Sequence, residues 1–235
     1  MKSKFKGLAV VLLSGGLDSA TALYLARSRG LKCFCLIFDY GQRHKREIES
    51  AKRIAKAAGC NFKVIKLHFP WKGSSLLDKL EKISLVVESS AGKIPATYVP
   101  GRNIIFLSIA FSCAEAMGAD AVYIGAHAQD YSGYPDCRPQ FYRALKKVIE
   151  TGTKAGVEKR GIKVETPLID KGKGEIIRMA LELGVPLELT WSCYKGGKIP
   201  CASCDSCHYR AKGFKEAGIK DPLMKNGKGK DRGGF

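Results

Sequence analysis

The chain has 235 residues, of which 45% are hydrophobic, and this share excludes an intrinsically disordered protein. Forty Lys and Arg residues against 22 Asp and Glu residues give a formal net charge of +18, which attracts anions such as phosphates, carboxylates or nucleic acid. No apolar run reaches the roughly 18 residues that a membrane-spanning helix requires.

The start of the chain imitates a secretory signal, because three lysines precede the apolar residues 7–13. This apolar stretch lies at the short limit for a signal, and no Ala-x-Ala cleavage site follows it. A buried first strand is the better interpretation. Without a signal, we expect a cytoplasmic protein whose nine cysteines stay reduced.

Strand-like apolar segments alternate with helix-like segments along the chain. Strands are expected at residues 8–14, 31–39, 62–67, 121–126 and 163–167, and helices at 19–29, 45–58, 102–117 and 173–183. Apolar strands separated by helices are typical of a parallel sheet covered on both faces. Residues 69–101 and 127–162 interrupt the alternation as two long excursions. We therefore expect an α/β fold that binds its ligands at the carboxyl ends of the strands.

A glycine-containing turn, Ser-Gly-Gly-Leu-Asp-Ser at residues 14–19, joins the first expected strand to the first expected helix. Paired glycines let a backbone approach an anion closely, and the helix N-terminus offers unpaired N–H groups. The turn lacks the Gly-Lys-Ser/Thr ending of a Walker loop and does not match Gly-x-Gly-x-x-Gly. An ordinary turn capped by Ser or Asp is the alternative. The whole six-residue string favours a phosphate-binding loop.

Four cysteines follow the spacing C-x7-C-x2-C-x2-C in the last part of the sequence. Thiolates this close together on a Gly- and Pro-rich loop fit a closed tetrahedral Zn²⁺ site, so we expect a structural metal. Disulfides and iron–sulfur ligation are alternatives, and His208 is an alternative ligand to the last cysteine. The expected ligands are Cys193, Cys201, Cys204 and Cys207.

Polar segments follow several of the expected strands. Residues 125–139 carry aromatic and charged side chains that suit a planar heterocycle, although a solvated surface loop is the alternative. Arg102 precedes the apolar helix and suits a bidentate contact with a phosphate or a carboxylate, or else a surface helix cap. Residues 39–44 end the second strand, where such folds place a nucleotide or a second substrate.

Together and in this order, these strings resemble the 7-cyano-7-deazaguanine synthase (QueC) family of PP-loop ATP pyrophosphatases. The resemblance runs through residues 14–19, 39–42, 99–103, 130–139, 190–194 and 201–207, and it covers nearly the whole chain from residue 8 to 222. Residues 130–139 and 191–194 are more specific than the phosphate loop, which the wider superfamily shares. Two segments depart from the family pattern, the glycine-rich residues 171–174 and the Lys/Gly tail beyond residue 222. Neither departure is expected to touch the chemistry.

The resemblance implies a Rossmann-like adenine nucleotide alpha hydrolase (PP-loop) fold and an ATP-dependent C–N ligase. Its substrates would be 7-carboxy-7-deazaguanine and ammonia, joined through an adenylated intermediate and then dehydrated to a nitrile. The resemblance also implies Mg²⁺ on the phosphates beside Asp18, and a homodimer. The residues implied to bind ATP are Leu13, Ser14, Gly15, Gly16, Leu17, Asp18, Ser19, Ala20 and Thr21, with Ser14 and Asp18 catalytic. The residues implied to bind the deazaguanine are Arg102, Asp130, Tyr134, Asp136 and Arg138.

We expect an ATP-pyrophosphatase domain at residues 1–190, a zinc-binding segment at 191–222 and a basic, disordered tail at 223–235. Two other functions stay open. A tRNA-modifying ATP pyrophosphatase that thiolates or aminates a base would explain the positive charge, but little length is left for an RNA-binding domain. A non-enzymatic zinc-ribbon protein that binds nucleic acid would explain the charge and the cysteines, but it leaves residues 14–19 without a role.

Overall fold

The computed structural model describes residues 5–71, 73–78, 94–127 and 133–224 of the chain. The strands in these ranges are β1 (Gly7–Leu12), β2 (Leu31–Asp39), β3 (Asn61–Lys66), β4 (Ala121–Tyr123) and β5 (Lys163–Glu165). The α-helices are α1 (Leu17–Ser28), α2 (Arg46–Ala57), α3 (Arg102–Met117), α4 (Pro139–Gly152), α5 (Lys154–Val157), α6 (Lys173–Glu182) and α7 (Asp205–Glu216). Short 3-10 helices, η2 (Pro135–Cys137) and η3 (Leu187–Leu189), complete the set.

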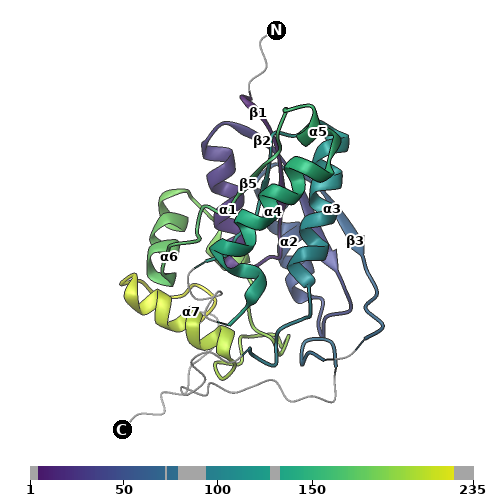
Figure 1. The fold of residues 1–235 in the computed structure, drawn as a ribbon. Helices are drawn as coiled ribbons and strands as arrows, with labels where there is room; N and C mark the ends of the chain where they lie inside the picture. Colours follow the sequence, from purple (N-terminus) through teal and green to yellow (C-terminus); the bar gives the residue numbers. More distant parts are fainter. Residues whose placement is uncertain (1–4, 72, 79–93, 128–132, 225–235) are drawn as a thin grey trace, which may run out of the picture.

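The strands pair in parallel in the order β3-β2-β1-β4-β5, which confirms the expected parallel sheet (Figure 1). The chain moves outward from β1 to β2 and β3, and then returns to the other side of β1 with β4. The loops that follow β1 and β4 therefore diverge at the carboxyl edge of the sheet. An open parallel sheet leaves a crevice for ligands at such a point.

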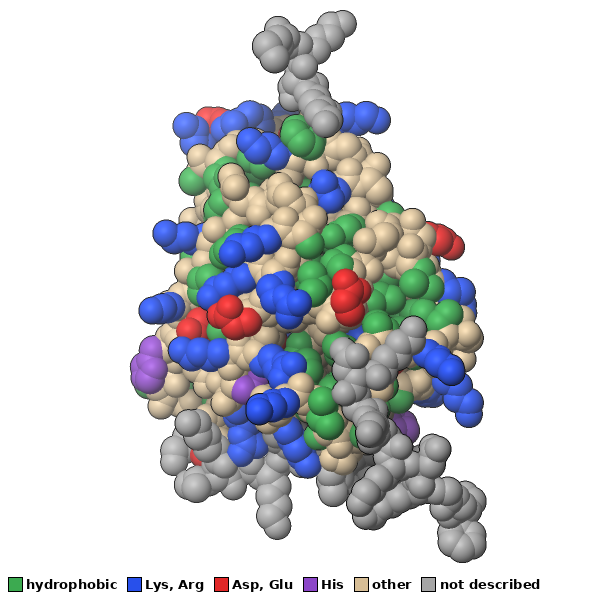
Figure 2. Space-filling model, turned by 180° about the vertical axis from the view of Figure 1, so that it is seen from behind, with side chains coloured by type: hydrophobic (Ala, Val, Ile, Leu, Met, Phe, Trp, Pro, Cys, Tyr) green, Lys and Arg blue, Asp and Glu red, His purple; other side chains and the backbone are tan. Residues whose placement is uncertain are grey.

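The surface of the described residues is rich in basic side chains. Figure 2 shows Lys and Arg spread over the face seen from behind, with few acidic side chains among them. The positive charge is therefore carried by the folded surface and not only by the ends of the chain.

None of the helices within the described ranges has the length and apolarity needed to span a bilayer.

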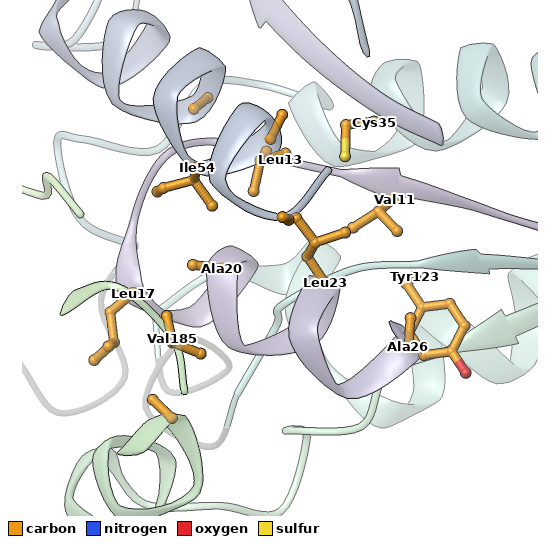
Figure 3. Close-up of a cluster of buried hydrophobic side chains, with 14 of the residues drawn as sticks. Val11, Leu13, Leu17, Ala20, Leu23, Ala26, Cys35, Ile54, Tyr123 and Val185 are labelled. Carbon is orange, nitrogen blue, oxygen red and sulfur yellow. The ribbon is translucent and has the colours of Figure 1, made fainter. Parts of the chain in front are cut away.

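Helices cover both faces of the sheet, because successive side chains of β1 point to opposite faces. Ala9 and Val11 pack with residues of α1, α2 and α6, whereas Val10 and Leu12 pack with residues of α3 and α4. Figure 3 shows the first cluster, in which Val11 lies among side chains of α1 such as Leu23. Double coverage explains why β1 reads as one continuous apolar run.

The structure adds helices that the sequence analysis did not anticipate. The segment 127–162, expected as an irregular excursion, contains α4 and α5. In α4 the residues Tyr142, Leu145 and Ile149 recur at helical spacing and are buried, and Pro139 occupies the first helical position, where its missing N–H is harmless. Helix α7 was also not anticipated; it begins one residue after Cys204 and packs against α6.

Several expected boundaries agree with the structure to within one residue or two, whereas the first expected strand, at 8–14, ends at Leu12 and two later strands also end early. Helix α3 spans residues 102–117 as expected, between Gly101 and Gly118, which both have positive φ (64° and 65°). The expected strands at 121–126 and 163–167 end earlier, at Tyr123 and Glu165. The residues that follow β4, at 124–126, line a cavity beside residues 14–19, and Gly125 packs against the backbone of Asp18.

Candidate active site

The phosphate loop connects β1 to α1 and is braced by its own hydroxyl groups. The Oγ atoms of Ser14 and Ser19 lie 3.0 Å apart, and Gly16 N–H donates to Ser14 Oγ at 3.3 Å. Ser19 Oγ donates in turn to the carbonyl of Gly16 at 3.1 Å. The first-turn N–H groups of α1 have no acceptors inside the helix and form the positive end of its dipole. The loop therefore offers hydroxyl and N–H donors to an anion.

Two glycines let neighbouring elements press against this loop. Gly15 has a φ of +89°, and a Cβ on it would lie 2.2 Å from the carbonyl oxygen of Glu47 and 2.8 Å from the backbone nitrogen of Ala51. A Cβ on Gly125, after β4, would lie 2.7 Å from the carbonyl carbon of Asp18. Only glycine allows these approaches, so α2 and the segment after β4 fix the loop from two sides.

A cavity of about 280 Å³, called here the large cavity, opens beside the phosphate loop. Its wall brings together Ser14, Gly16 and Asp18 of the loop with Arg102 of α3, although the sequence separates these groups by more than eighty residues. The remaining lining is Leu12, Leu13, Ser19, Phe38, Tyr40, Gln42, Arg43, His44, Glu47, Leu76, Asn103, Phe106, Ile124, Gly125, Ala126, Tyr134, Cys137, Trp191, Ser192, Tyr194 and Ser206. The mixture of aromatic walls and a few charged groups suits a planar, charged ligand.

A second cavity of about 200 Å³, called here the small cavity, adjoins the first. Its lining includes Leu17, His127, Thr97, Lys173, Asp205, Tyr209 and Arg210. Five residues line both cavities, namely Asp18, Tyr134, Ser192, Tyr194 and Ser206. The start of α1 therefore lies where the two cavities meet.

At this junction Asp18 is held by a buried lysine. Lys173 Nζ donates to the two carboxylate oxygens of Asp18 at 2.8 and 3.0 Å, and it lies 2.9 Å from His127 Nε2. Burial alone would raise the pKa of Asp18, but Lys173 and His127 outweigh this effect and hold that pKa below its usual value. We expected the departure at residues 171–174 to leave the chemistry untouched. The structure places Lys173 of this segment directly against Asp18, with 8% of the residue exposed.

A second charged group faces the large cavity near the end of β2. Gln42 Nε2 donates to Glu47 Oε1 at 3.1 Å, and Gln42 Oε1 accepts from the backbone N–H of Tyr40 at 2.8 Å. Burial raises the pKa of Glu47 to about 7, although Arg102 and the Gln42 hydrogen bond act in the opposite direction. The guanidinium of Arg102 lies 6.0 Å from the centre of the Tyr40 ring. A cation and a titrating carboxyl group therefore share one wall.

The predicted substrate loop divides into different environments. Tyr134 lines both cavities, and its hydroxyl is 2.6 Å from Thr97 Oγ1. Asp136 is buried and accepts from the backbone N–H of Asn103 at 3.1 Å, which fixes the first turn of α3 beside Arg102. Arg138 is exposed and is not among the residues that line the two cavities. Asp130 lies outside the described residues.

The other predicted ATP residues also lie in two environments. Leu13 and Leu17 each line one cavity. Ala20 and Thr21 are buried in α1, where Thr21 Oγ1 donates to the carbonyl of Leu17 at 2.8 Å, and neither lines the two cavities. Ala20 and Thr21 therefore help to hold α1 in place by packing in the core, and they do not form part of the cavity walls.

The four predicted metal ligands come together as one cluster. The Sγ atoms of Cys193, Cys201, Cys204 and Cys207 all lie within 4.8 Å of one another. Zinc–sulfur bonds of about 2.3 Å in a tetrahedron place sulfurs about 3.8 Å apart, and the sulfurs of Cys201 and Cys207 are 3.9 Å apart. All nine cysteines lie in the described residues and are free, so disulfides are absent there. The donor set fits a tetrahedral metal ion.

The cysteine cluster is joined to the cavity wall by the residues around it. Trp191 N–H donates to the carbonyl of Gly15 at 2.8 Å, and the Arg46 guanidinium lies 3.8 Å from the centre of the Trp191 ring. Ser192 and Tyr194, which flank Cys193, line both cavities. A metal at the cluster would therefore fix one wall of the site as well as the local fold.

The sequence analysis missed Lys173, Glu47 and Trp191 as site residues. Glu47 lies on an amphipathic helix, where the polar face is normally solvated, and Trp191 was read only as part of a family string. The segment 39–44 was expected near a nucleotide, and its Tyr40 and Gln42 do line the large cavity. For Lys173 the one available signal was its position at the start of the helix after β5, at the carboxyl edge of the sheet.

Comparisons with known proteins show that this chain is similar to the members of one family. The family described as queuosine biosynthesis protein QueC matches residues 8–218. The 7-cyano-7-deazaguanine synthase of Thermoplasma acidophilum is 52% identical over 216 residues, which cover 92% of this chain and 90% of that protein. The 7-cyano-7-deazaguanine synthase of Trichodesmium erythraeum is 50% identical over 226 residues, which cover 92% of this chain and 99% of that protein.

Among solved structures, NMN synthetase from Francisella tularensis is 16% identical and matches with a TM-score of 0.48 over 92% of this chain and 79% of that chain.

Proposed function

The chain belongs to the QueC family, and from this membership we propose that it is an ATP-dependent ligase that converts 7-carboxy-7-deazaguanine and ammonia to 7-cyano-7-deazaguanine. One observation carries the proposal. The phosphate loop and the Arg102 cation share one cavity whose lining also includes aromatic side chains such as Phe38 and Phe106. Such a cavity suits a planar, anionic substrate held beside a nucleotide phosphate.

The reaction needs an activated carboxyl group, because oxide is a poor leaving group. In the first step a carboxylate oxygen of the substrate bonds to the α-phosphorus of ATP, and the bond from that phosphorus to pyrophosphate breaks. Ammonia then displaces AMP and gives the amide. The amide oxygen then bonds to the α-phosphorus of a second ATP, and the bond from that phosphorus to pyrophosphate breaks. Loss of AMP and two protons from this adenylated amide gives the nitrile.

The phosphate loop contributes positioning and electrostatics to both activations. Ser14 Oγ and the first N–H groups of α1 are donors that can hold the departing pyrophosphate, with Ser19 Oγ positioning Ser14. These groups are fixed by Gly15 and Gly125 before ATP arrives, so they need no rearrangement when charge develops. Ser14 and Asp18 are the loop residues to which we assign catalytic roles.

Two metals complete the proposal. When bound, Mg²⁺ would supply charge neutralisation on the phosphates, and Asp18 would hold it, since Asp18 lines both cavities. Zn²⁺ would occupy the cluster of Cys193, Cys201, Cys204 and Cys207 in a structural role, because four thiolates leave no open coordination position.

For the deazaguanine we assign direct contacts to Arg102 and Tyr134, which line the large cavity. Asp136 acts on the same ligand through Asn103 and the start of α3. Asp130 and Arg138 stay predictions on the basis of the family resemblance.

The proposed function also suggests how the chain is divided into domains, where the protein is located and how it assembles. We assign residues 1–190 to the ATP-pyrophosphatase domain and residues 191–222 to the zinc-binding segment. A cytoplasmic location would keep the four thiolates reduced for metal binding. A homodimer is supported by exposed apolar side chains on α3, α4 and α5, such as Ile104, Val148 and Val157, and sedimentation velocity tests it.

The test is mass spectrometry of the products after the protein is mixed with ATP, Mg²⁺, ammonium and 7-carboxy-7-deazaguanine. We expect AMP, pyrophosphate and the nitrile, with the amide as an intermediate. A parallel reaction replaces the deazaguanine with unmodified tRNA, because the broad positive surface is the property that a tRNA-modifying enzyme would share. AMP formed only with tRNA would overturn the proposal in favour of that alternative.

A further inference from the structure

The described lining of the large cavity contains two carboxylates, Asp18 and Glu47, and their environments are opposite. Lys173 Nζ donates to both carboxylate oxygens of Asp18, at 2.8 and 3.0 Å, so this carboxylate is poorly suited to accept a proton. Burial instead raises the pKa of Glu47 to about 7. Glu47 is therefore the carboxyl group of this cavity that can gain and lose a proton near neutral pH.

A glutamine at the end of β2 holds the Glu47 carboxylate in place. Gln42 Nε2 donates to Glu47 Oε1 at 3.1 Å and to the carbonyl of Phe38 at 3.1 Å. Gln42 Oε1 accepts from the backbone N–H of Tyr40 at 2.8 Å, so the amide is fixed at both of its ends. Glu47 Oε2 has no hydrogen-bond partner among the described residues. An oriented carboxylate with one open oxygen has the geometry of a general base.

Glu47 also lies close to the place where the reaction occurs. Its backbone carbonyl packs against the phosphate loop, since a Cβ on Gly15 would lie 2.2 Å from that oxygen. Arg102 is near enough for its charge to act on the pKa of Glu47. A substrate carboxylate held by Arg102 beside the phosphate loop would therefore form its adenylate on the cavity wall that carries Glu47.

The step that follows adenylation needs a proton acceptor. Ammonia carries three hydrogens and the amide nitrogen carries two, so one proton leaves the nitrogen when the C–N bond forms. A base is most effective when its pKa lies near the working pH, because it is then both ionised and basic. Ionised Glu47 also destabilises the folded chain, and a group retained at such a cost is typical of a functional site.

We propose that Glu47 is a catalytic residue, the general base that accepts a proton from ammonia as ammonia attacks the acyl adenylate. This inference rests on the proposed function, because it concerns the second step of that reaction. The nitrogen lone pair bonds to the acyl carbon, and the C–O bond breaks with its electrons leaving on AMP. The proton passes from the nitrogen to Glu47 Oε2 and then to water.

Other ionisable groups share the cavity with Glu47. Burial raises the pKa of Tyr40 to about 12, with Glu47 acting in the same direction, so Tyr40 stays protonated near neutral pH. Burial lowers the pKa of His44, so a change in rate above its usual range does not come from this imidazole. The remaining charged or titratable groups of the described lining are Asp18, Arg43, Arg102, Tyr134, Cys137 and Tyr194.

The test compares two steps in the wild type and in Glu47→Gln, which keeps the shape of the side chain and removes the base. Exchange of labelled pyrophosphate into ATP, with 7-carboxy-7-deazaguanine and without ammonium, reports adenylation alone and should change less than about threefold. Amide formation with ammonium chloride should fall about 10²- to 10⁴-fold. Glu49→Gln is the matched control, because Glu49 is exposed on the same helix, and it should retain wild-type rates in both assays.

The pH dependence separates a base from a residue that only orients the substrate. In the wild type, the rate of amide formation per concentration of uncharged ammonia should rise about tenfold per pH unit below pH 7 and level off above it, because Glu47 acts in its ionised form. Glu47→Gln should lose this rise, whereas Glu47→Asp should keep it at a lower rate. An unchanged pH profile in Glu47→Gln, or adenylation reduced as much as amide formation, would overturn the inference.

Folding of the variants is monitored by thermal melting. Should Glu47→Gln fail to fold, Glu47→Asp must still slow amide formation more than adenylation. Failure of the proposed function has a different signature: the wild type forms no AMP with 7-carboxy-7-deazaguanine, and the role assigned to Glu47 then fails with it. If the wild type makes the amide and Glu47→Gln does so equally fast, only the inference about Glu47 fails.

Discussion

Asp18 and Lys173 are an interdependent pair of charges in a site with little access to water. Their side chains are 25% and 10% exposed, and His127 beside them is almost completely buried. Removing one partner of such a pair leaves the other charge without compensation, which costs more than the pair itself contributes. Activity and stability are therefore coupled at these two residues.

The substitution Asp18→Ala should abolish AMP formation and lower the free energy of unfolding by about 2–3 kcal/mol, because the buried Lys173 ammonium loses its partner. The double variant Asp18→Ala/Lys173→Met should recover most of the stability and none of the activity. Urea denaturation and an AMP assay on the three proteins measure both effects. Metal bound by the cysteine cluster should be unchanged, and a double variant less stable than Asp18→Ala would contradict the coupling.

Glu47 gives a pH-dependent prediction, because its pKa is raised whereas that of Asp18 is lowered. Its pKa is raised by burial from 4.5 to about 7, so its ionisation destabilises the free protein as pH rises from 4.5 through 7. Arg102 and Gln42 face it and reduce this cost without removing it. Glu47→Gln should therefore be more stable than the wild type at pH 8 by about 1–2 kcal/mol.

The stability difference between Glu47→Gln and the wild type should shrink toward zero near pH 4.5, as followed by denaturation at several pH values. Glu49→Gln is the matched control, because Glu49 is an exposed residue of the same helix. A difference that grows as pH falls would show that the Glu47 carboxyl group is not destabilised by burial.

At the scale of whole elements, local patterns were enough to predict most of the sheet and its main helices. The five strands and the helices α1, α2, α3 and α6 follow from the spacing of apolar residues. Helix α7 was missed because it begins inside the cysteine motif and few of its residues are apolar, and α4 was missed because polar residues precede it. The strands β4 and β5 were predicted too long, since the apolar residues after β4 pack in the site and not in the sheet.

The packing of α2 against the phosphate loop gives the prediction at this scale. Gly15→Ala places a Cβ into the carbonyl of Glu47 at a positive φ, so α2 or the loop must move. We expect the free energy of unfolding to fall by about 2–4 kcal/mol. We also expect AMP formation to be lost, because the phosphate loop can no longer keep its geometry. Thermal melting measures the first effect, with Gly16→Ala as the stability control, because Gly16 has a φ of −79° and no atom closer than 3.5 Å to its added Cβ. Equal losses for the two variants would contradict this account.

At the scale of the molecule, the cysteine cluster connects fold and site. Cys204 is fully buried in the cluster, and Trp191, Ser192 and Tyr194 nearby form part of the cavity walls. Cys204→Ser should lose the bound metal and lower the melting temperature by several degrees, because a structural metal contributes directly to folding. Elemental analysis and a thermal melt test this.

Cys113→Ser is the matched control, since Cys113 lies on α3 away from the cluster. Removal of the metal from the wild type with a chelator should reproduce the melting behaviour of Cys204→Ser. A Cys204→Ser protein that is inactive but melts normally would instead assign the cluster a direct part in the reaction.

The sequence was sufficient to identify the QueC family, the parallel sheet and the four-cysteine cluster, because each of these depends on residues close together in the chain. It was not sufficient for the contacts that complete the site. Lys173 meets Asp18 across 155 positions of sequence, and no periodicity or spacing encodes such a meeting. Asp136 likewise reads as a ligand-binding residue in a polar loop, although it is buried against the start of α3.

The walls of the large cavity come from distant stretches of the polypeptide, with Ser14 at one extreme and Ser206 at the other. During translation the first of these leaves the ribosome long before the second. A partly synthesised chain can fold its early strands and yet present no enclosed pocket for a nucleotide. Both cavities are therefore complete only when the chain extends through α7, which carries Ser206.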